Sequence, residues 1–359
     1  MNDCYITSTG SFLPGEPIDN DTIAQYLGTM IGESKVKRKI LSVNGIRTRH
    51  YALDKHQQVT YSAYELAAEA VKQCLSQNPN LELDYLSAGS THTPLLAPGL
   101  ASVLHDELHK RNLVVRPLEI NSNSGICSSG AQALVNASRA IRSGDASKAV
   151  CIGVEQPSVA LRSKAFRPTY DLLAIFKNVR TSKWFMSTFL RFMLSDGAGA
   201  FLLESQPNPH KMSLKVNWTY SRSFANEAPL CMQLPSKPPL VLRQDVTILS
   251  KYMAPLSERV VQEALHKHAE TLDDYAAVLP HMSSYYFESV VKRIITKFAT
   301  REVRYWTNLR TAGNTGAASI YIILDEYLKT QPVAKGDRLL LFVPESGQFN
   351  FVLISLTVV

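Results

Sequence analysis

The stretch Asn123–Leu134, NSGICSSGAQAL, sets one cysteine among small residues. Small or apolar residues then recur at helical spacing, which predicts a half-buried helix that begins near Cys127. These residues are Ala131, Leu134, Val135, Ser138 and Ile141. The free N–H groups and the positive dipole end of such a helix favour a thiolate, so we expect a lowered pKa for Cys127. The alternative is a structural cysteine packed among small neighbours.

The order of elements around Cys127 occurs twice in the chain. The first copy consists of a strand at Asp84–Gly89, a loop at Thr91-His92, the Cys127 helix, the strand Ala149–Val154, and Glu155. The second copy consists of the strand Asp274–His281, the helix start Gly313–Ile320, the strand Leu339–Val343, and Glu345, and a helix expected at Leu256–His268 precedes it. The spacing agrees, since 43 residues separate Asp84 from Cys127 and 40 separate Asp274 from Asn314. The repeat predicts an α/β fold of two duplicated βαβ-rich halves, residues 1–205 and 206–359, with mixed sheets around central helices.

The duplication has a geometric consequence. If a pseudo-twofold axis relates the halves, Cys127 and Asn314 occupy equivalent helix starts, and His281 occupies the strand end equivalent to Thr91-His92. We therefore expect these three side chains to meet where the halves face each other. The alternatives are a hydrogen-bonded histidine at a strand end for His281 and a helix cap for Asn314.

An aromatic and basic insertion spans residues 158–194, and a proline-rich connection, Gln206–Tyr252, follows it. We expect the insertion to form short helices with an apolar face toward a ligand tunnel or a subunit interface. The candidate tunnel residues are Phe166, Trp184, Phe185 and Phe189. The alternative is an ordinary amphipathic surface element.

The amino-acid composition limits the kinds of protein that the chain can be. A hydrophobic fraction of 45% and a charged fraction of 19% are typical of a globular chain. Its five scattered cysteines form no C-x-x-C pair, so we expect no metal site and a reducing compartment. With no secretory signal and no membrane span apparent, the cytoplasm is the expected location. The net charge of +7 is spread out, which favours a polyanionic ligand or an acidic carrier protein over nucleic acid.

Together, the order and spacing of these motifs resemble the thiolase superfamily, and most closely the 3-oxoacyl-(acyl-carrier-protein) synthase III group. The resemblance rests on Gly45-Ile46-Arg47, Gly125–Gly130, Asp196–Ala200, Pro280-His281 and Gly313–Ser319. It implies a layered α/β/α/β/α fold and a homodimer. It also implies that Cys127 takes an acyl group from a thioester, while His281 and Asn314 stabilise the enolate of the second substrate. Gly347 resembles the residue whose N–H joins that of Cys127 in an oxyanion hole.

The substrates implied are acyl groups carried by the phosphopantetheine of coenzyme A or acyl carrier protein, with no separate cofactor. Basic residues offer a landing surface for such a carrier: Arg47 in a basic turn, and Lys292, Arg293 and Lys297 on the helix after His281. The alternative for that helix is a solvated face.

Departures from the family's pattern surround the site of the second substrate, at Met282–Tyr286 and Ser346–Gln348. They favour a Claisen-condensing enzyme of specialised metabolism that joins two acyl thioesters, one of them a β-ketoacyl chain. Such enzymes can cyclise the product to a cyclohexanedione or dialkylresorcinol precursor, and the pattern also resembles enzymes that form stilbene precursors. The alternatives are a fatty-acid-initiating synthase that uses malonyl carrier protein, an acyltransferase to oxygen or nitrogen, and a non-catalytic partner in a heterodimeric synthase.

Overall fold

The computed structural model describes residues 2–76, 81–168, 170, 172, 182–236 and 241–359. One ten-stranded sheet runs through the molecule in the order β12-β11-β13-β14-β8-β1-β7-β6-β4-β5. The first five of its strands along the chain are β1 (Tyr5–Phe12), β4 (Tyr85–Ser90), β5 (Glu119–Ser124), β6 (Lys148–Glu155) and β7 (Gly197–Glu204). The other five are β8 (Leu214–Ser223), β11 (Ala277–Pro280), β12 (Arg304–Tyr305), β13 (Arg338–Pro344) and β14 (Asn350–Val358).

The two sets of five strands have the same topology. The order β1-β7-β6-β4-β5 in one half corresponds to β8-β14-β13-β11-β12 in the other. In each half the first two pairings are antiparallel and the last two are parallel. A short antiparallel pairing of β1 with β8 joins the halves. The duplication predicted from the sequence is therefore visible in the sheet, while the boundary at residues 205 and 206 stays a prediction.

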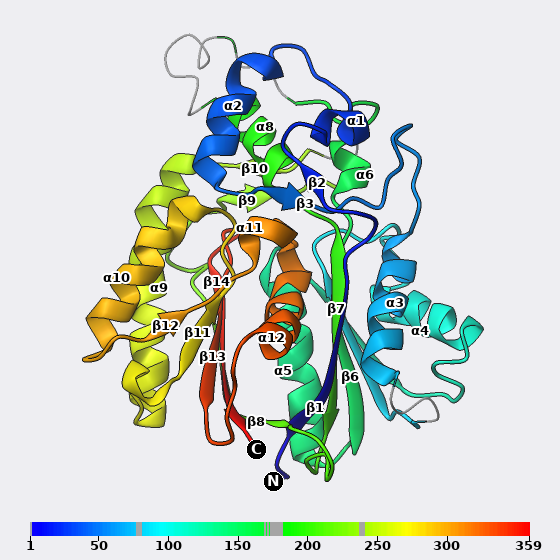
Figure 1. Cartoon of the computed structure of the whole chain (residues 1–359), viewed down its shortest axis with the longest axis vertical. Helices are drawn as coiled ribbons and strands as arrows, with labels where there is room; N and C mark the ends of the chain where they lie inside the picture. The colour runs from blue at the N-terminus through cyan, green and yellow to red at the C-terminus, as the bar shows by residue number, and fades with distance from the viewer. Residues whose placement is uncertain (1, 77–80, 169, 171, 173–181, 237–240) are drawn as a thin grey trace.

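Helices complete five layers (Figure 1). On one outer face lie α3 (Ala63–Leu75) and α4 (Leu100–Lys110), and on the other lie α9 (Val246–His268) and α10 (Glu288–Phe298). Between the two halves of the sheet lie α5 (Ser128–Ser143) and α12 (Ser319–Thr330), which are buried over most of their length. The predicted α/β/α/β/α arrangement is thus confirmed.

Glycines allow the central elements to touch. A Cβ added at Gly130 of α5 or at Gly153 of β6 would collide with the carbonyl oxygen of Ala317. Ala317 belongs to the 3-10 turn η4 (Gly316–Ala318), which precedes α12. The hydroxyl of Tyr321 on α12 also donates to the carbonyl of Gly130, at 2.7 Å. These backbone contacts hold the starts of α5 and α12 together, and so fix the place where Cys127 and Asn314 can meet.

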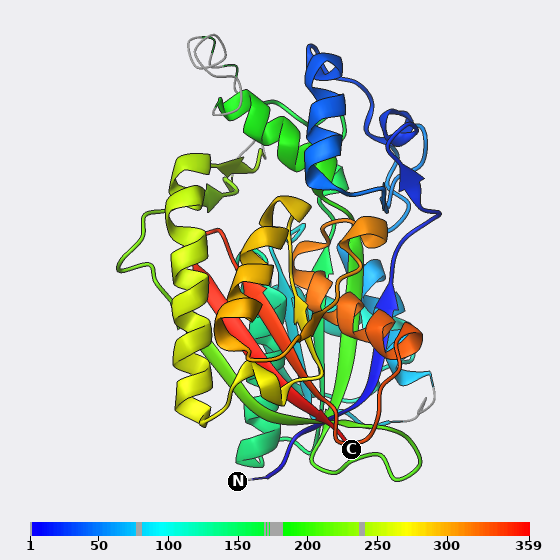
Figure 2. The same cartoon turned by 60° about the vertical axis from the view of Figure 1, so that its left-hand side comes forward.

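A cap covers one end of the sheet (Figures 1 and 2). Its helices are α1 (Ile23–Leu27), α2 (Glu33–Asn44), α6 (Ser158–Leu161) and α8 (Lys183–Met193). The short strand pairs β2 (Ile18–Asp19) with β3 (Thr48–Arg49), and β9 (Met232–Gln233) with β10 (Arg243–Gln244), lie beside them. The buried guanidinium of Arg191 on α8 pairs with Glu33 of α2 at 2.5 Å and donates to the carbonyls of Leu27, Gly28 and Leu161. One buried cation therefore ties α8 to α1, α2 and α6.

Two expectations need correction. The proline-rich segment 206–252 is more than a connection, because it contains β8, whose residues alternate between buried and half-buried positions. The helix expected at Leu256–His268 begins earlier, at Val246, and runs through Pro255. Asp245 caps it by accepting hydrogen bonds from the N–H groups of Thr247 and Ile248, which fixes the start two turns ahead of the proline.

The remaining short elements are η2 (Leu272–Asp274), η3 (Tyr285–Phe287) and α11 (Leu309–Ala312). Within the described ranges no helix combines the length and the apolar character needed to span a membrane. The cytoplasmic location stays a prediction.

Candidate active site

Cys127 occupies the N-cap position of α5, directly after β5 and its short turn, as the sequence predicts. It is half-buried and lines two pockets. The expectation of a lowered pKa was wrong. Burial raises the pKa of the Cys127 thiol, and the carboxylates of Glu345 and Glu155 raise it further. The resting residue is therefore a thiol, and attack on a thioester requires removal of its proton.

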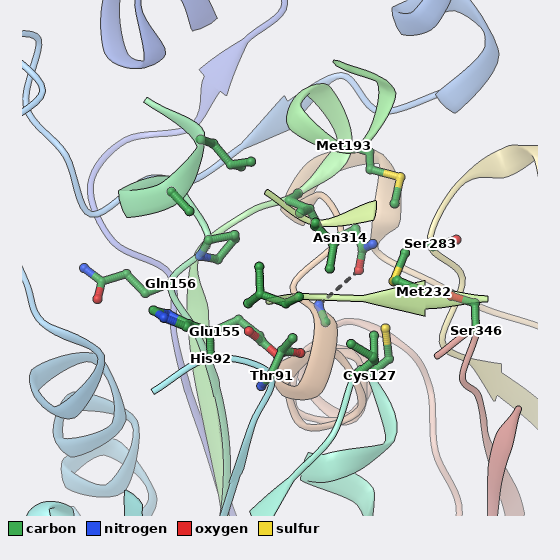
Figure 3. Close-up of a pocket in the computed structure, with 18 residues that line it drawn as sticks. Thr91, His92, Cys127, Glu155, Gln156, Met193, Met232, Ser283, Asn314 and Ser346 are labelled. Carbon is green, nitrogen blue, oxygen red and sulfur yellow. Dashed lines mark hydrogen bonds between the residues drawn. The ribbon is translucent and has the colours of Figure 1, made fainter. Parts of the chain in front are cut away.

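Asn314 presents a defined end of its amide to the site (Figure 3). Its Oδ1 accepts a hydrogen bond from the N–H of Gly316 at 3.0 Å, and among the described residues Nδ2 has no hydrogen-bond partner, so it is the donor left for a ligand. The backbone of Asn314 is held by Met193 and Ser195 at the end of α8, through hydrogen bonds of 3.0 and 2.9 Å. The amide is thus oriented before any substrate arrives, as an oxyanion donor needs to be.

His281 lies at the end of β11, buried beside the start of α12. Its Nδ1 is 2.6 Å from Oγ of Ser319, so Nε2 is the ring nitrogen left for a ligand. Burial lowers the pKa of His281 to about 4. The imidazole is therefore neutral at physiological pH, and it shares a pocket with Cys127.

Gly347 lies in the loop between β13 and β14, against the residue that precedes Cys127. A Cβ at this position would lie 2.5 Å from Oε1 of Glu345 and 2.8 Å from Cγ1 of Ile126. The carbonyl of Gly347 accepts hydrogen bonds from the N–H groups of Cys231 and Met232. Only glycine fits here without displacement, while the role of its N–H in an oxyanion hole stays a prediction.

Three pockets meet near Cys127. The first runs from Cys127 past Thr91 and Glu155 to Leu161 of α6. The second runs from Cys127 and His281 between α9 and α10, where Met253, Val291 and Ile294 line it. The third opens between the cap and α9, lined by Val43, Phe185, Phe189 and Phe287. Ser283 lines all three pockets, so it marks their junction.

The four candidate tunnel residues divide into two pairs. Phe185 and Phe189 line the third pocket. Phe166 and Trp184 are instead buried in the packing of the cap, where Phe166 lies under the guanidinium of Arg191 and Trp184 stacks on Tyr170. Neither belongs to the lining of the three pockets formed by the residues that the structure describes. Positions 169, 171 and 173–181 of the insertion lie outside the described residues.

The candidate carrier-binding residues are exposed, and none of them lines either pocket that Cys127 lines. Arg47 lies in the turn between α2 and β3. On α10, Lys292 pairs with Glu288, and Arg293 and Lys297 both pair with Glu258. These acidic neighbours offset part of the basic charge, so carrier binding by this face stays a prediction.

Ser319 and Glu155 are site residues to which sequence reasoning gave no role. Ser319 belongs to the small-residue motif that begins at Gly313, and its contact with His281 depends on the fold alone. The repeat in the sequence already marked Glu155, because Glu155 closes the first copy of the repeat as Glu345 closes the second. Within the described ranges, no group of three or more His, Cys, Asp or Glu side chains could hold a metal ion.

Comparisons with known proteins agree with this geometry. Residues 40–178 match the family model for the thiolase N-terminal domain, and residues 265–347 match that for the C-terminal part of 3-oxoacyl-(acyl-carrier-protein) synthase III. A β-ketoacyl-(acyl-carrier-protein) synthase III of Clostridium perfringens is 23% identical over 352 residues, which cover 95% of each chain.

Solved structures share the whole fold. AbyA1, a tetronic acid condensing enzyme, superposes with a TM-score of 0.78 at 21% identity and covers 99% of both chains. The synthase III of Pseudomonas aeruginosa superposes with a TM-score of 0.74 at 20% identity, and the match covers 99% of this chain and 98% of that one. OleA of Xanthomonas campestris superposes with a TM-score of 0.76 at 17% identity, and the match covers 99% of this chain and 98% of that one.

Fold, family matches and the cysteine at the start of α5 define a thiolase-fold condensing enzyme of the acyltransferase class. Two stretches of the chain match family models of the thiolase superfamily, and nearly the whole chain is similar to 3-oxoacyl-(acyl-carrier-protein) synthase III.

Proposed function

We propose that the protein joins two acyl thioesters by a Claisen condensation through an acyl-Cys127 intermediate, with a β-ketoacyl chain as one of the two. The observation that carries this proposal is the pair of pockets that share Cys127. Their walls are more apolar than polar, and they leave the cysteine toward different elements, α6 in one case and the space between α9 and α10 in the other. Two acyl chains can therefore lie at one nucleophile at the same time.

The first half of the reaction loads Cys127. The sulfur attacks the carbonyl carbon of an acyl thioester, the carrier thiol leaves with the proton, and a new thioester forms on the cysteine. The third pocket, open between the cap and α9, is the route by which a phosphopantetheine arm reaches Ser283 and the junction. In this scheme the first pocket holds the loaded chain.

The second half forms the carbon–carbon bond. The second acyl thioester loses carbon dioxide, or loses an α-proton to water, and the resulting enolate attacks the acyl carbonyl on Cys127. The carbon–sulfur bond breaks, and the leaving sulfur of Cys127 takes up a proton from water and returns to the thiol. The enolate oxygen accepts hydrogen bonds from Nδ2 of Asn314 and Nε2 of His281. Both groups are neutral, buried and held in place by local hydrogen bonds, so they supply preorganised stabilisation. Cyclisation of a product that carries a β-keto group would give the cyclohexanedione or resorcinol precursor expected from the sequence.

The test uses two thioesters of different chain length and mass spectrometry of the product. Wild-type protein is expected to yield a product that contains both chains, and a product only from malonyl thioesters would contradict the proposal. Val291→Phe, which fills the second pocket, should shorten the longest second chain accepted while Cys127 is still acylated. Ala160→Phe, which fills the first pocket, should instead shorten the chain that loads Cys127. Equal effects of the two variants on both chains would count against two separate channels.

We further propose a homodimer formed along β5. This strand ends the sheet order, is largely exposed, and carries no lysine or proline to protect its edge. Exposed apolar side chains lie on this strand and next to it. Ile120 is on the strand and Val115 comes just before it. Leu95 and Leu96 are on the loop before Gly99, and Gly99 lies against Ser122 of β5. Sedimentation velocity should give twice the mass of the chain, and a monomer at micromolar concentration would contradict this pairing.

A further inference from the structure

Glu155, the last residue of β6, places a buried carboxyl group on the wall of the first pocket, which it shares with Cys127. Three donors converge on one of its oxygens: Oε1 accepts from the N–H of Thr91 at 2.9 Å, from the hydroxyl of Thr91 at 2.5 Å, and from the N–H of Ala317 at 3.1 Å. From the described residues, no hydrogen bond reaches Oε2. The free oxygen is therefore available to whatever fills the pocket.

The repeat provides an internal comparison, because Glu345 follows β13 as Glu155 closes β6. Both oxygens of Glu345 have partners. The hydroxyl of Ser128 donates to Oε2, and Asn350 and the N–H of Gln348 donate to Oε1 at 3.3 and 3.4 Å. An unpartnered oxygen is thus not a consequence of the fold at this position, and Glu155 differs from its counterpart by facing a ligand pocket.

The protonation of Glu155 follows from its surroundings. Burial raises the pKa of Glu155 to about 7. Oε1 already accepts three hydrogen bonds, so below that pH the proton resides on Oε2, which becomes a donor. Apolar side chains such as Ile126, Ala160 and Leu161 line the same pocket. A saturated acyl chain would leave this donor without a partner, which is unfavourable for a buried polar group.

We infer that Oε2 of Glu155 donates a hydrogen bond to a keto oxygen on the acyl group that is loaded onto Cys127. Figure 3 shows Thr91, Glu155 and His92 grouped on one side of the pocket and Cys127 on the other. The inference rests on the proposed function and deepens it, because it states which of the two chains carries the keto group. A β-ketoacyl thioester loads the cysteine, and the second chain enters the other pocket.

The test compares the rates at which 3-oxoacyl and saturated acyl thioesters of equal length acylate Cys127, followed by intact mass. Wild-type protein at pH 6 is expected to prefer the 3-oxoacyl group by roughly 3- to 10-fold, the range that one hydrogen bond supplies. The preference should fall at pH 8, where Glu155 is mostly ionised. Glu155→Gln puts an amide donor at the position of Oε2 and should keep the preference at both pH values. Glu155→Met, of similar length without a donor, should lose it.

Each rate ratio is its own control, since a folding defect slows both thioesters alike. Other titratable groups that line the pocket or act on the pKa of Glu155 are His92 after β4, Cys127 before α5 and Asp196 before β7. A Gln variant whose preference still falls with pH would assign the effect to one of these and overturn the inference. An unchanged ratio in Glu155→Met, or a wild-type ratio near one, would also overturn it while leaving the proposed function intact. In this experiment, the one result that would remove the proposed function itself is a failure of every thioester to acylate Cys127.

Discussion

Replacing Cys127 with alanine is expected to abolish acylation and lower product formation by roughly 10³-fold or more, because no other group at the junction can form the thioester intermediate. Intact mass spectrometry after incubation with an acyl thioester measures the effect directly. The wild-type protein should gain the mass of one acyl group, and the variant should gain none.

Cys74→Ala is a suitable control for this experiment. Cys74 is buried in α3, where its thiol contacts the carbonyl of Ser8, and it lines none of the three pockets of the described chain. This variant should be acylated like the wild type. Equal labelling of the Cys127→Ala variant would place the nucleophile elsewhere and refute the mechanism.

Asn314→Asp should separate the two halves of the reaction. Aspartate keeps the oxygen that accepts from Gly316 and loses the Nδ2–H donor, so the local turn is preserved while the enolate loses a hydrogen bond. We expect Cys127 to be acylated as before and carbon–carbon bond formation to fall by roughly 10²- to 10³-fold, the cost of removing one oxyanion donor. Single-turnover assays that follow the acyl-enzyme and the condensed product measure both steps.

Asn217→Asp offers a matched change on β8, where the amide donates to Ser355 and Thr357. It removes the same type of donor outside the three pockets and should leave condensation unchanged. If condensation persists in Asn314→Asp, Asn314 has no part in the chemistry.

Much of the fold follows from sequence periodicity and repetition. Two units with matched spacing were enough to predict the duplicated sheet and the central helices, because each unit uses the same alternation of buried strand and small-residue helix. The strand β8 was not predicted, since the prolines around it suggested a loop and its half-buried alternation depends on pairing with β1 and β14. Tertiary pairing decides such a strand more than its own residues do.

The site was predictable as a set of residues and less so as an electrostatic environment. A helix terminus alone predicts a lowered pKa for Cys127, yet burial raises this pKa, and two carboxylates from the ends of β6 and β13 raise it further. Phe166 and Trp184 fit an apolar tunnel by composition, but the buried cation of Arg191 and the packing of the cap hold them elsewhere. Both differences arise from contacts between segments distant in sequence, which spacing does not reveal.

The contact of Gly130 and Gly153 with the carbonyl of Ala317 also bears on how this molecule could change over time. After a gene duplication, the sequences of two fused copies are free to diverge at positions where a residue contacts only its own copy or solvent. At this contact, a single added methyl group on either glycine would push the copies apart and move the nucleophile of one away from the amide of the other. New substrate specificities can therefore arise through substitutions that line the pockets. The two glycines at the backbone contact between the copies have little freedom to vary.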